Sequence, residues 1–145
     1  MRTKRFSNMT YDELLQFEQS RSGKTSAARP RHIESRIQQQ CKKWFDIRFA
    51  PYRRMLFAVP NGGLRGKVEA KIMKAEGITA GVADMILLVP RKGFGSLCIE
   101  FKTKTGRQSD SQKSWQSECE RAGNKYIIIR DLDHFIREIT AYLTD

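Results

Sequence analysis

The sequence has few cysteines, few histidines and no long apolar run among its 145 residues. No segment approaches membrane-spanning length and the basic N-terminus lacks a signal-peptide pattern, so we expect a cytoplasmic protein. Cys41, Cys98 and Cys119 are odd in number and include no Cys-x-x-Cys pair, which argues against a disulfide framework and a zinc site. With only His32 and His134 present, a histidine-based metal centre is also disfavoured.

The chain is strongly basic, and its positive charge is unevenly distributed. The net charge of +11 divides into +4 for residues 1–31, 0 for 32–41, +7 for 42–74 and 0 for 75–145. A surface with this excess attracts polyanions with repeated phosphates. Acidic small molecules or membranes would also be attracted, but no long amphipathic basic helix with a hydrophobic face is present. A nucleic acid is therefore the better partner.

The length suggests one domain with a modest core, preceded by an extension. Residues 10–13 form a capping box that opens a short helix to about residue 19, and residues 21–29 have the composition of a linker. We therefore place a basic N-terminal extension at residues 1–29 and the main domain at residues 30–145. The extension is either an accessory arm or a plain tail.

The first half of the main domain is expected to run helix, strand, helix. After Pro30, apolar residues recur at helical spacing and are expected to face the core: Ile33, Ile37, Cys41, Trp44 and Phe45. A basic turn at residues 48–54 leads to a short strand at 55–59. A second helix is expected at 67–76, ending near Gly77.

The second half is expected to run hairpin, helix, strand, helix. Strands at 84–89 and 96–102 flank a turn at 90–95, and a capping box at 109–112 opens a helix with Trp115, Cys119 and Ala122 inward. The apolar run 126–129 suits a central strand, and Asp131 or Asp133 caps the last helix. This order predicts an α/β domain with a mixed central sheet flanked by helices.

The hairpin brings charged side chains to one end. Alternation along residues 96–102 places Glu100 and Lys102 on the same face. Asp84 starts the preceding strand and lies at the open end of the hairpin. It shares the face of Glu100 only if it pairs with an even-numbered residue, which needs an odd-length loop or a bulge. A slip of one residue would send it to the opposite side.

An aspartate and a glutamate held together repel unless a cation lies between them. Carboxylate oxygens and waters suit Mg²⁺ or Mn²⁺, which can activate water against a phosphodiester, while Lys102 positions that water or stabilises negative charge. An isolated Glu-x-Lys is more often the solvated face of an edge strand. Asp84, together with the preceding Gly77 and Gly81, favours the hydrolytic interpretation.

Five motifs in order resemble the VRR-NUC family, the virus-type replication-repair nucleases of the PD-(D/E)xK superfamily. They span roughly residues 30–143: Pro60-Asn-Gly-Gly-Leu-Arg65, Lys74-Ala-Glu-Gly77, Gly81-x-x-Asp84, Ile99-Glu-Phe-Lys102 and Gln112-x-x-Trp115. The resemblance implies the PD-(D/E)xK fold and a Mg²⁺- or Mn²⁺-dependent endonuclease. One departure is Ala83, where the family usually has proline, and this removes no metal ligand.

Carried over by position, the family's metal-binding carboxylates correspond to Asp84 and Glu100, and its catalytic lysine to Lys102. Its first-helix acid corresponds to Glu34, which the sequence alone would place in solvent. Its later glutamine corresponds to Gln112, which either only caps its helix or also reaches the catalytic strand or the attacking water. Both roles can hold together.

The expected DNA contacts are mostly basic residues, several of which precede the metal site: Arg48, Arg53, Arg54, Asn61, Arg65, Lys67 and Lys104. For Lys104, a solvated side chain is equally compatible with the sequence.

The sequence therefore predicts a divalent-metal-dependent DNA endonuclease. The resemblance implies selectivity for branched, flapped or junction DNA, a homodimer, and a role in phage or mobile-element replication and repair. The protein would then act in the nucleoid or in the cytoplasm of an infected cell. The main alternative is an inactive nuclease-like module that binds structured DNA, and a weaker one is an RNA-directed nuclease of the same fold.

Overall fold

The fold was obtained as a computed structural model, which describes residues 29–60 and 66–145. The expected helix near residues 10–19, most of the linker, Asn61 and Arg65 lie outside the described residues. In chain order the elements are α2 (Pro30–Arg48), the 3-10 helix η1 (Ala50–Tyr52), β1 (Leu56–Ala58), α3 (Lys67–Ala75), β2 (Met85–Leu87), β3 (Leu97–Phe101), α4 (Asp110–Arg121), β4 (Lys125–Ile129) and α5 (Leu132–Leu143). This is the predicted order of helices and strands.

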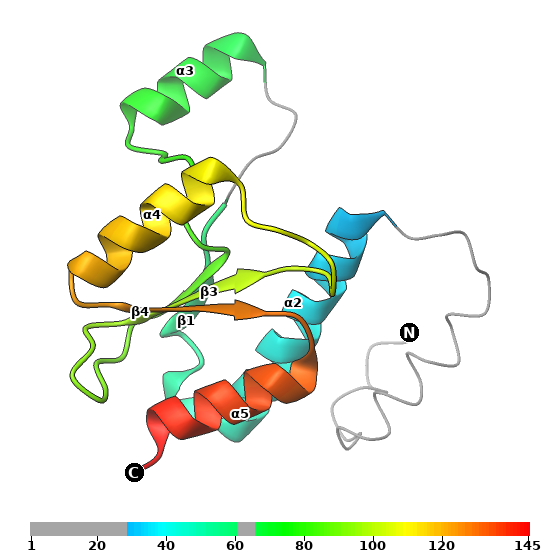
Figure 1. Cartoon of the computed structure of the whole chain (residues 1–145), viewed down its shortest axis with the longest axis vertical. Coiled ribbons are helices and arrows are strands. Elements are labelled where there is room, and N and C mark those ends of the chain that lie inside the picture. Colours follow the sequence, from blue (N-terminus) through cyan, green and yellow to red (C-terminus); the bar gives the residue numbers. More distant parts are fainter. Residues whose placement is uncertain (1–28, 61–65) are drawn as a thin grey trace, which may run out of the picture.

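The four strands form one mixed sheet in the order β1-β2-β3-β4. β1 pairs with β2 and β2 with β3 in antiparallel fashion, whereas β3 and β4 are parallel. Helices α2 and α5 cover one face of the sheet and α4 covers part of the other (Figure 1). The predicted α/β domain with a mixed sheet flanked by helices is confirmed.

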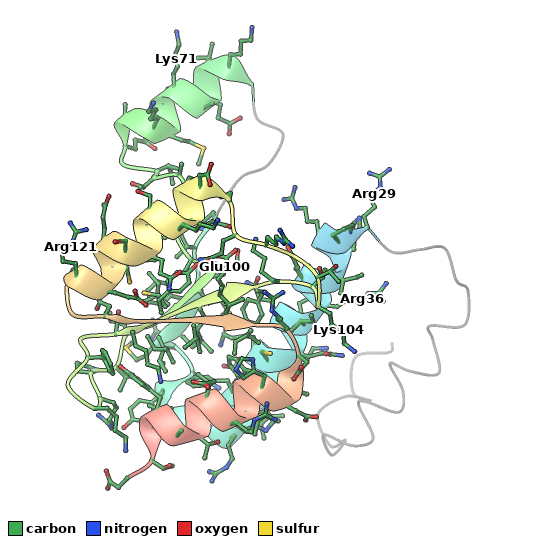
Figure 2. All side chains as sticks on the ribbon, viewed as in Figure 1. Arg29, Arg36, Lys71, Glu100, Lys104 and Arg121 are labelled. Atoms are coloured by element: carbon green, nitrogen blue, oxygen red, sulfur yellow. The ribbon has the colours of Figure 1, made fainter. Side chains whose placement is uncertain are left out.

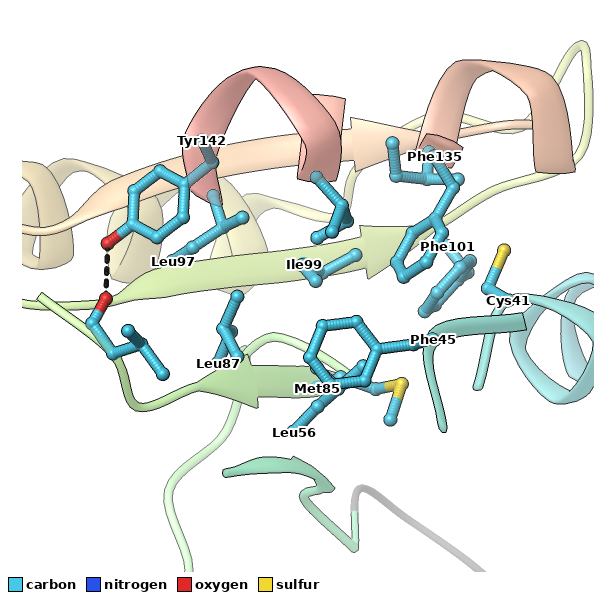
Figure 3. Packing of buried hydrophobic residues seen from close by; sticks show 13 residues of the cluster. Cys41, Phe45, Leu56, Met85, Leu87, Leu97, Ile99, Phe101, Phe135 and Tyr142 are labelled. Carbon is cyan, nitrogen blue, oxygen red and sulfur yellow. Dashed lines mark hydrogen bonds between the residues drawn. The ribbon is translucent and has the colours of Figure 1, made fainter. Parts of the chain in front are cut away.

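Strand β3 is buried along its whole length, and its side chains alternate between two apolar clusters. Leu97, Ile99 and Phe101 pack with residues of α2 and α5 in the main core (Figure 3). Cys98 points to the smaller cluster under α4. Tyr142 donates a 2.8 Å hydrogen bond to the carbonyl of Val89, which ties α5 to the end of β2. Glu100 therefore belongs to the α4 face, as the alternation predicted.

Three sequence-based predictions about burial were wrong. The strand at residues 125–129 is not central, because β4 pairs only with β3 among the described residues and lies at the sheet edge. Its apolar composition reflects helices on both of its faces. Ile33 is 37 % exposed because the first turn of α2 precedes the part packed on the sheet. Ala122 is exposed because it lies at the end of α4.

Helix α3 projects beyond the first turn of α4 and stands apart from the layered core (Figure 1). The helix was predicted, but none of its residues is buried, and Val68 and Ile72 are 74 % and 53 % exposed. Gly77, with φ of +104°, follows its C-cap as expected for a residue in the left-handed region. Within the described residues, no helix is long and apolar enough to cross a membrane.

Candidate active site

The pairing of β2 with β3 sets the position of the two carboxylates. Met85 lies opposite Ile99, and the same register carried one residue further sets Asp84 opposite Glu100. The segment between the strands, residues 88–96, has an odd length, so the condition for a shared face is met. The Phe101 amide donates a 2.8 Å hydrogen bond to Oδ2 of Asp84, which fixes the aspartate at the end of the ladder.

Glu100 is 2 % exposed, and only one of its two carboxylate oxygens has partners. Oε1 accepts a hydrogen bond from Nε2 of Gln112 at 2.6 Å and lies 3.1 Å from Nζ of Lys102. Oε2 is buried and has no hydrogen-bond partner among the described residues. Because a buried carboxylate oxygen is costly to leave unpaired, this atom requires a cation or proton donor.

Burial and mutual repulsion make both carboxyl groups harder to ionise. Burial, and next the charge of Asp84, raises the pKa of Glu100 from 4.5 to about 7, although Lys102 opposes this. Burial also raises the pKa of Asp84, against the Phe101 amide and the Lys102 charge. A divalent cation between the two groups would remove this penalty.

Gly81 holds the segment before Asp84 against the first turn of α4. Its φ is +83°, and a Cβ at this position would lie 2.2 Å from the carbonyl oxygen of Ser111. Ala83 is fully buried in the cluster under α4. The glycine therefore allows the backbone of the Asp84 strand to touch the helix that carries Gln112.

Gln112 performs both of the roles considered for it. Its side-chain oxygen accepts a 2.9 Å hydrogen bond from the backbone amide of Ser109. The backbone amide of Gln112 donates in turn to Oγ of Ser109, so the predicted capping box is present. The side-chain nitrogen Nε2 of Gln112 donates a hydrogen bond to Glu100 at the same time. One side chain thus couples the start of α4 to the carboxylate on β3.

Glu34 lies near Asp84 and Glu100 but does not form a three-ligand cluster with them. Its Oε1 accepts a 3.3 Å hydrogen bond from the Thr103 amide, and its charge raises the pKa of both Asp84 and Glu100. No three His, Cys, Asp or Glu residues in the described ranges are grouped to hold a metal ion. Glu34 thus lies near the two carboxylates, and its role as a metal contact stays a prediction.

The structure separates several predicted DNA contacts from the carboxylates. Arg53 and Arg54 precede β1 at the end of the sheet away from Asp84, where the Leu88 amide donates to the Met55 carbonyl. Arg48 ends α2 and lies 14 positions after Glu34, which corresponds to about 21 Å along the helix.

Two other predicted contacts lie elsewhere on the surface. Lys67 begins α3, where it is exposed. Lys104 does not continue the β3 face, because the strand ends at Phe101 and Lys104 lies exposed in the following bend. Among the predicted DNA contacts that the structure describes, Lys104 is therefore the one placed just beyond the carboxyl end of β3.

Sequence reasoning missed one residue at the same sheet edge. Arg130, directly after β4, donates hydrogen bonds to backbone carbonyls of the turn that follows β3. The signal available in the sequence was its position after an apolar strand, since functional side chains gather at the carboxyl ends of parallel strands.

Comparisons with known proteins agree with this fold. The model of the VRR-NUC domain matches residues 32–130. A solved structure described as a VRR_NUC domain protein has a TM-score of 0.66 and 23 % sequence identity, covering 77 % of this chain and 88 % of that chain, which is a likeness of fold. No curated protein matches this chain in sequence. Because the family model matches well over half of the sequence, the chain belongs to the VRR-NUC family of nuclease domains.

Proposed function

We propose that this protein is a Mg²⁺- or Mn²⁺-dependent DNA endonuclease whose metal ligands are Asp84 and Glu100. The observation that carries the proposal is the buried, partnerless Oε2 of Glu100 beside a second carboxylate on the same sheet face. Mg²⁺ is commonly held by one or two carboxylates with water and substrate phosphates, so this donor set fits it. The Phe101 amide binds Oδ2 of Asp84, which holds this second carboxylate beside Glu100.

A bound divalent ion would polarise a phosphodiester oxygen and acidify a water molecule. The protein's own side chains orient this site. Lys102, with 11 % of its side chain exposed, stays within 3.1 Å of Glu100 and can stabilise negative charge that develops on the phosphate. Gln112 fixes the rotamer of Glu100 through Oε1, which leaves Oε2 for the metal. Glu34 adds negative potential from the side of α2.

Cleavage assays test this proposal. Labelled four-way junction, flap, linear duplex and single-stranded DNA, and matching RNA, would be incubated with Mg²⁺, Mn²⁺ or EDTA. Asp84→Asn should abolish cleavage while DNA binding stays equal or becomes slightly stronger, because negative charge near the phosphate is removed. Asp133→Asn, an exposed position on α5, is the matched control. Binding without cleavage by the wild type would favour the inactive module, and cleavage that survives EDTA would contradict the metal role.

We further propose that the substrate is branched, flapped or junction DNA and that the active form is a homodimer, as the family resemblance implies. An exposed apolar area on the sheet supports self-association. Met55 and Leu88 are neighbours across β1 and β2 and are 39 % and 55 % exposed, and Phe57 on the same face is 40 % exposed. Light scattering during size-exclusion chromatography should give a dimer that Leu88→Lys weakens. A monomer at cleavage-competent concentrations would contradict the homodimer.

A further inference from the structure

Arg130 lies next to the proposed catalytic lysine at the carboxyl edge of the sheet. The parallel register of β3 with β4 pairs Phe101 with Ile129, and carried one residue further it sets Arg130 beside Lys102. The Lys102 amide donates a 3.0 Å hydrogen bond to the Ile129 carbonyl, so the ladder persists to this point. Arg130 therefore follows the neighbouring strand β4 at the same end of the sheet as Glu100 and Lys102.

One nitrogen of the Arg130 guanidinium is fully committed to the turn after β3. Its Nη1 donates to the carbonyls of Thr103 and Gly106, the latter at 2.8 Å, and more weakly to that of Lys104 at 3.4 Å. The Thr103 amide in turn binds Glu34. Because the guanidinium is planar, this anchoring fixes the direction of its other donors.

The remaining donors of Arg130 have no protein partner in the described part of the chain. Nε and Nη2 form no hydrogen bond there, and no carboxylate of residues 29–60 or 66–145 forms an ion pair with Arg130. An oriented guanidinium with unused donors and no counter-ion is suited to an oxyanion, and two adjacent N–H groups match the oxygens of a phosphate.

Basic residues lie near Arg130, together with the acidic Glu34 and Asp131. Lys104 is exposed on the turn that Arg130 holds, and the contact between Thr103 and Glu34 places the basic N-terminal part of α2 beside that turn. Figure 2 shows Lys104 and Arg36 on the same side of the domain, beyond the end of β3. Lys102 lies 3.1 Å from Glu100, whereas Arg130 is bound to the turn at residues 103–106.

We propose that Arg130 binds a DNA backbone phosphate next to the one that is hydrolysed, using Nε and Nη2 while Nη1 stays bound to the turn. The proposal rests on the proposed function, because DNA must be the substrate. It assigns a substrate-positioning role to a residue that would otherwise only fasten the turn at residues 103–106.

A scan of neutral phosphates tests the contact directly. DNA in which single phosphates are replaced by methylphosphonate would be titrated by fluorescence anisotropy in EDTA, where the proposed function allows binding without cleavage. We expect the wild type to bind about tenfold more weakly when the phosphate facing Arg130 is neutral. Arg130→Gln should bind unmodified DNA about tenfold more weakly, show a salt slope lower by about one, and lose no further affinity at that position.

One control variant separates the phosphate contact from a general loss of positive charge. Arg137→Gln removes one positive charge on the exposed side of α5. It should keep the wild-type methylphosphonate profile.

The proposal is overturned if Arg130→Gln remains sensitive at every position that affects the wild type, or if Arg137→Gln loses its sensitivity at the same position. If the wild type binds no DNA, the proposed function itself is wrong. If the wild type binds DNA but does not cleave it, only the catalytic part of the proposed function is wrong, and the binding scan still decides the role of Arg130.

Discussion

Replacing Glu100 by glutamine is expected to change the stability of the metal-free protein relative to the wild type in a pH-dependent way. The variant should gain more stability at alkaline pH than at acidic pH. Glu100 is almost fully buried, and its pKa is raised from 4.5 to about 7. Between these values the folded protein binds more protons than the unfolded chain, so stability falls as pH rises through this window, and the loss is complete above the folded pKa. Glutamine keeps the shape of the side chain and removes this titration.

The size of the effect follows from the pKa difference. Each pKa unit corresponds to about 1.4 kcal/mol, so the ionised Glu100 costs the folded, metal-free protein about 3 kcal/mol at pH 8. The stability advantage of Glu100→Gln over the wild type should therefore grow by about 2.5 kcal/mol between pH 5 and pH 8, because part of the cost is already present at pH 5. At about 2–4 °C per kcal/mol, the difference in Tm should widen by roughly 5–10 °C.

Urea unfolding in EDTA at several pH values, followed by fluorescence of Trp44 and Trp115, measures this difference. Because Glu100→Gln also removes the ion pair with Lys102, the stability difference at a single pH does not report the titration. Only the change of this difference with pH does. Glu118→Gln, which removes an exposed charge on α4, is the matched control and should give a flat difference. If the advantage of Glu100→Gln does not change with pH, the reasoning about its burial is refuted.

Three further predictions concern the residues around Glu100. Gly81→Val should destabilise the protein by about 2 kcal/mol or more and lower cleavage, because the new side chain collides with Ser111 in a left-handed backbone conformation; thermal melting measures this. Gln112→Glu keeps a capping-box residue but removes the donor to Glu100, so cleavage should fall about tenfold while the melting temperature in Mg²⁺ changes little. Unchanged cleavage would show that Gln112 is only a cap. Lys102→Met should lower single-turnover cleavage far more than DNA affinity, since one phosphate contact changes the salt slope by only about one.

The arrangement of the carboxylates could be predicted only in part. Alternation placed Glu100 and Lys102 on one face. The face of Asp84 stayed open, because the expected turn at residues 90–95 has an even length, whereas the segment between the observed strands has an odd one. The capping box at Gln112 was equally readable. What the sequence could not give was the contact of Gln112 with Glu100, which depends on how closely Gly81 lets the Asp84 segment approach α4.

The position of the basic residues was less predictable because sequence distance and spatial distance diverge along a helix. The excess charge at residues 42–74 was expected beside the metal site, but α2 carries the chain about 28 Å over its 19 residues, so Arg48 lies far from Glu34. The DNA-binding role of Arg48, Arg53 and Arg54 stays a prediction, and on this geometry they would contact a distant part of the substrate. The sequence did not indicate Arg130 as a site residue, because its contacts depend on how the turn after β3 folds back against the end of β4.

The central claim is that Asp84 and Glu100 together hold one or more divalent cations. Crystals soaked in Mn²⁺, measured near the manganese absorption edge, test it most directly through the anomalous difference map. We predict a peak within bonding distance of both carboxylates that is lost in crystals of Asp84→Asn. A map with no peak between these side chains at saturating Mn²⁺, or a peak that Asp84→Asn leaves unchanged, would contradict the claim.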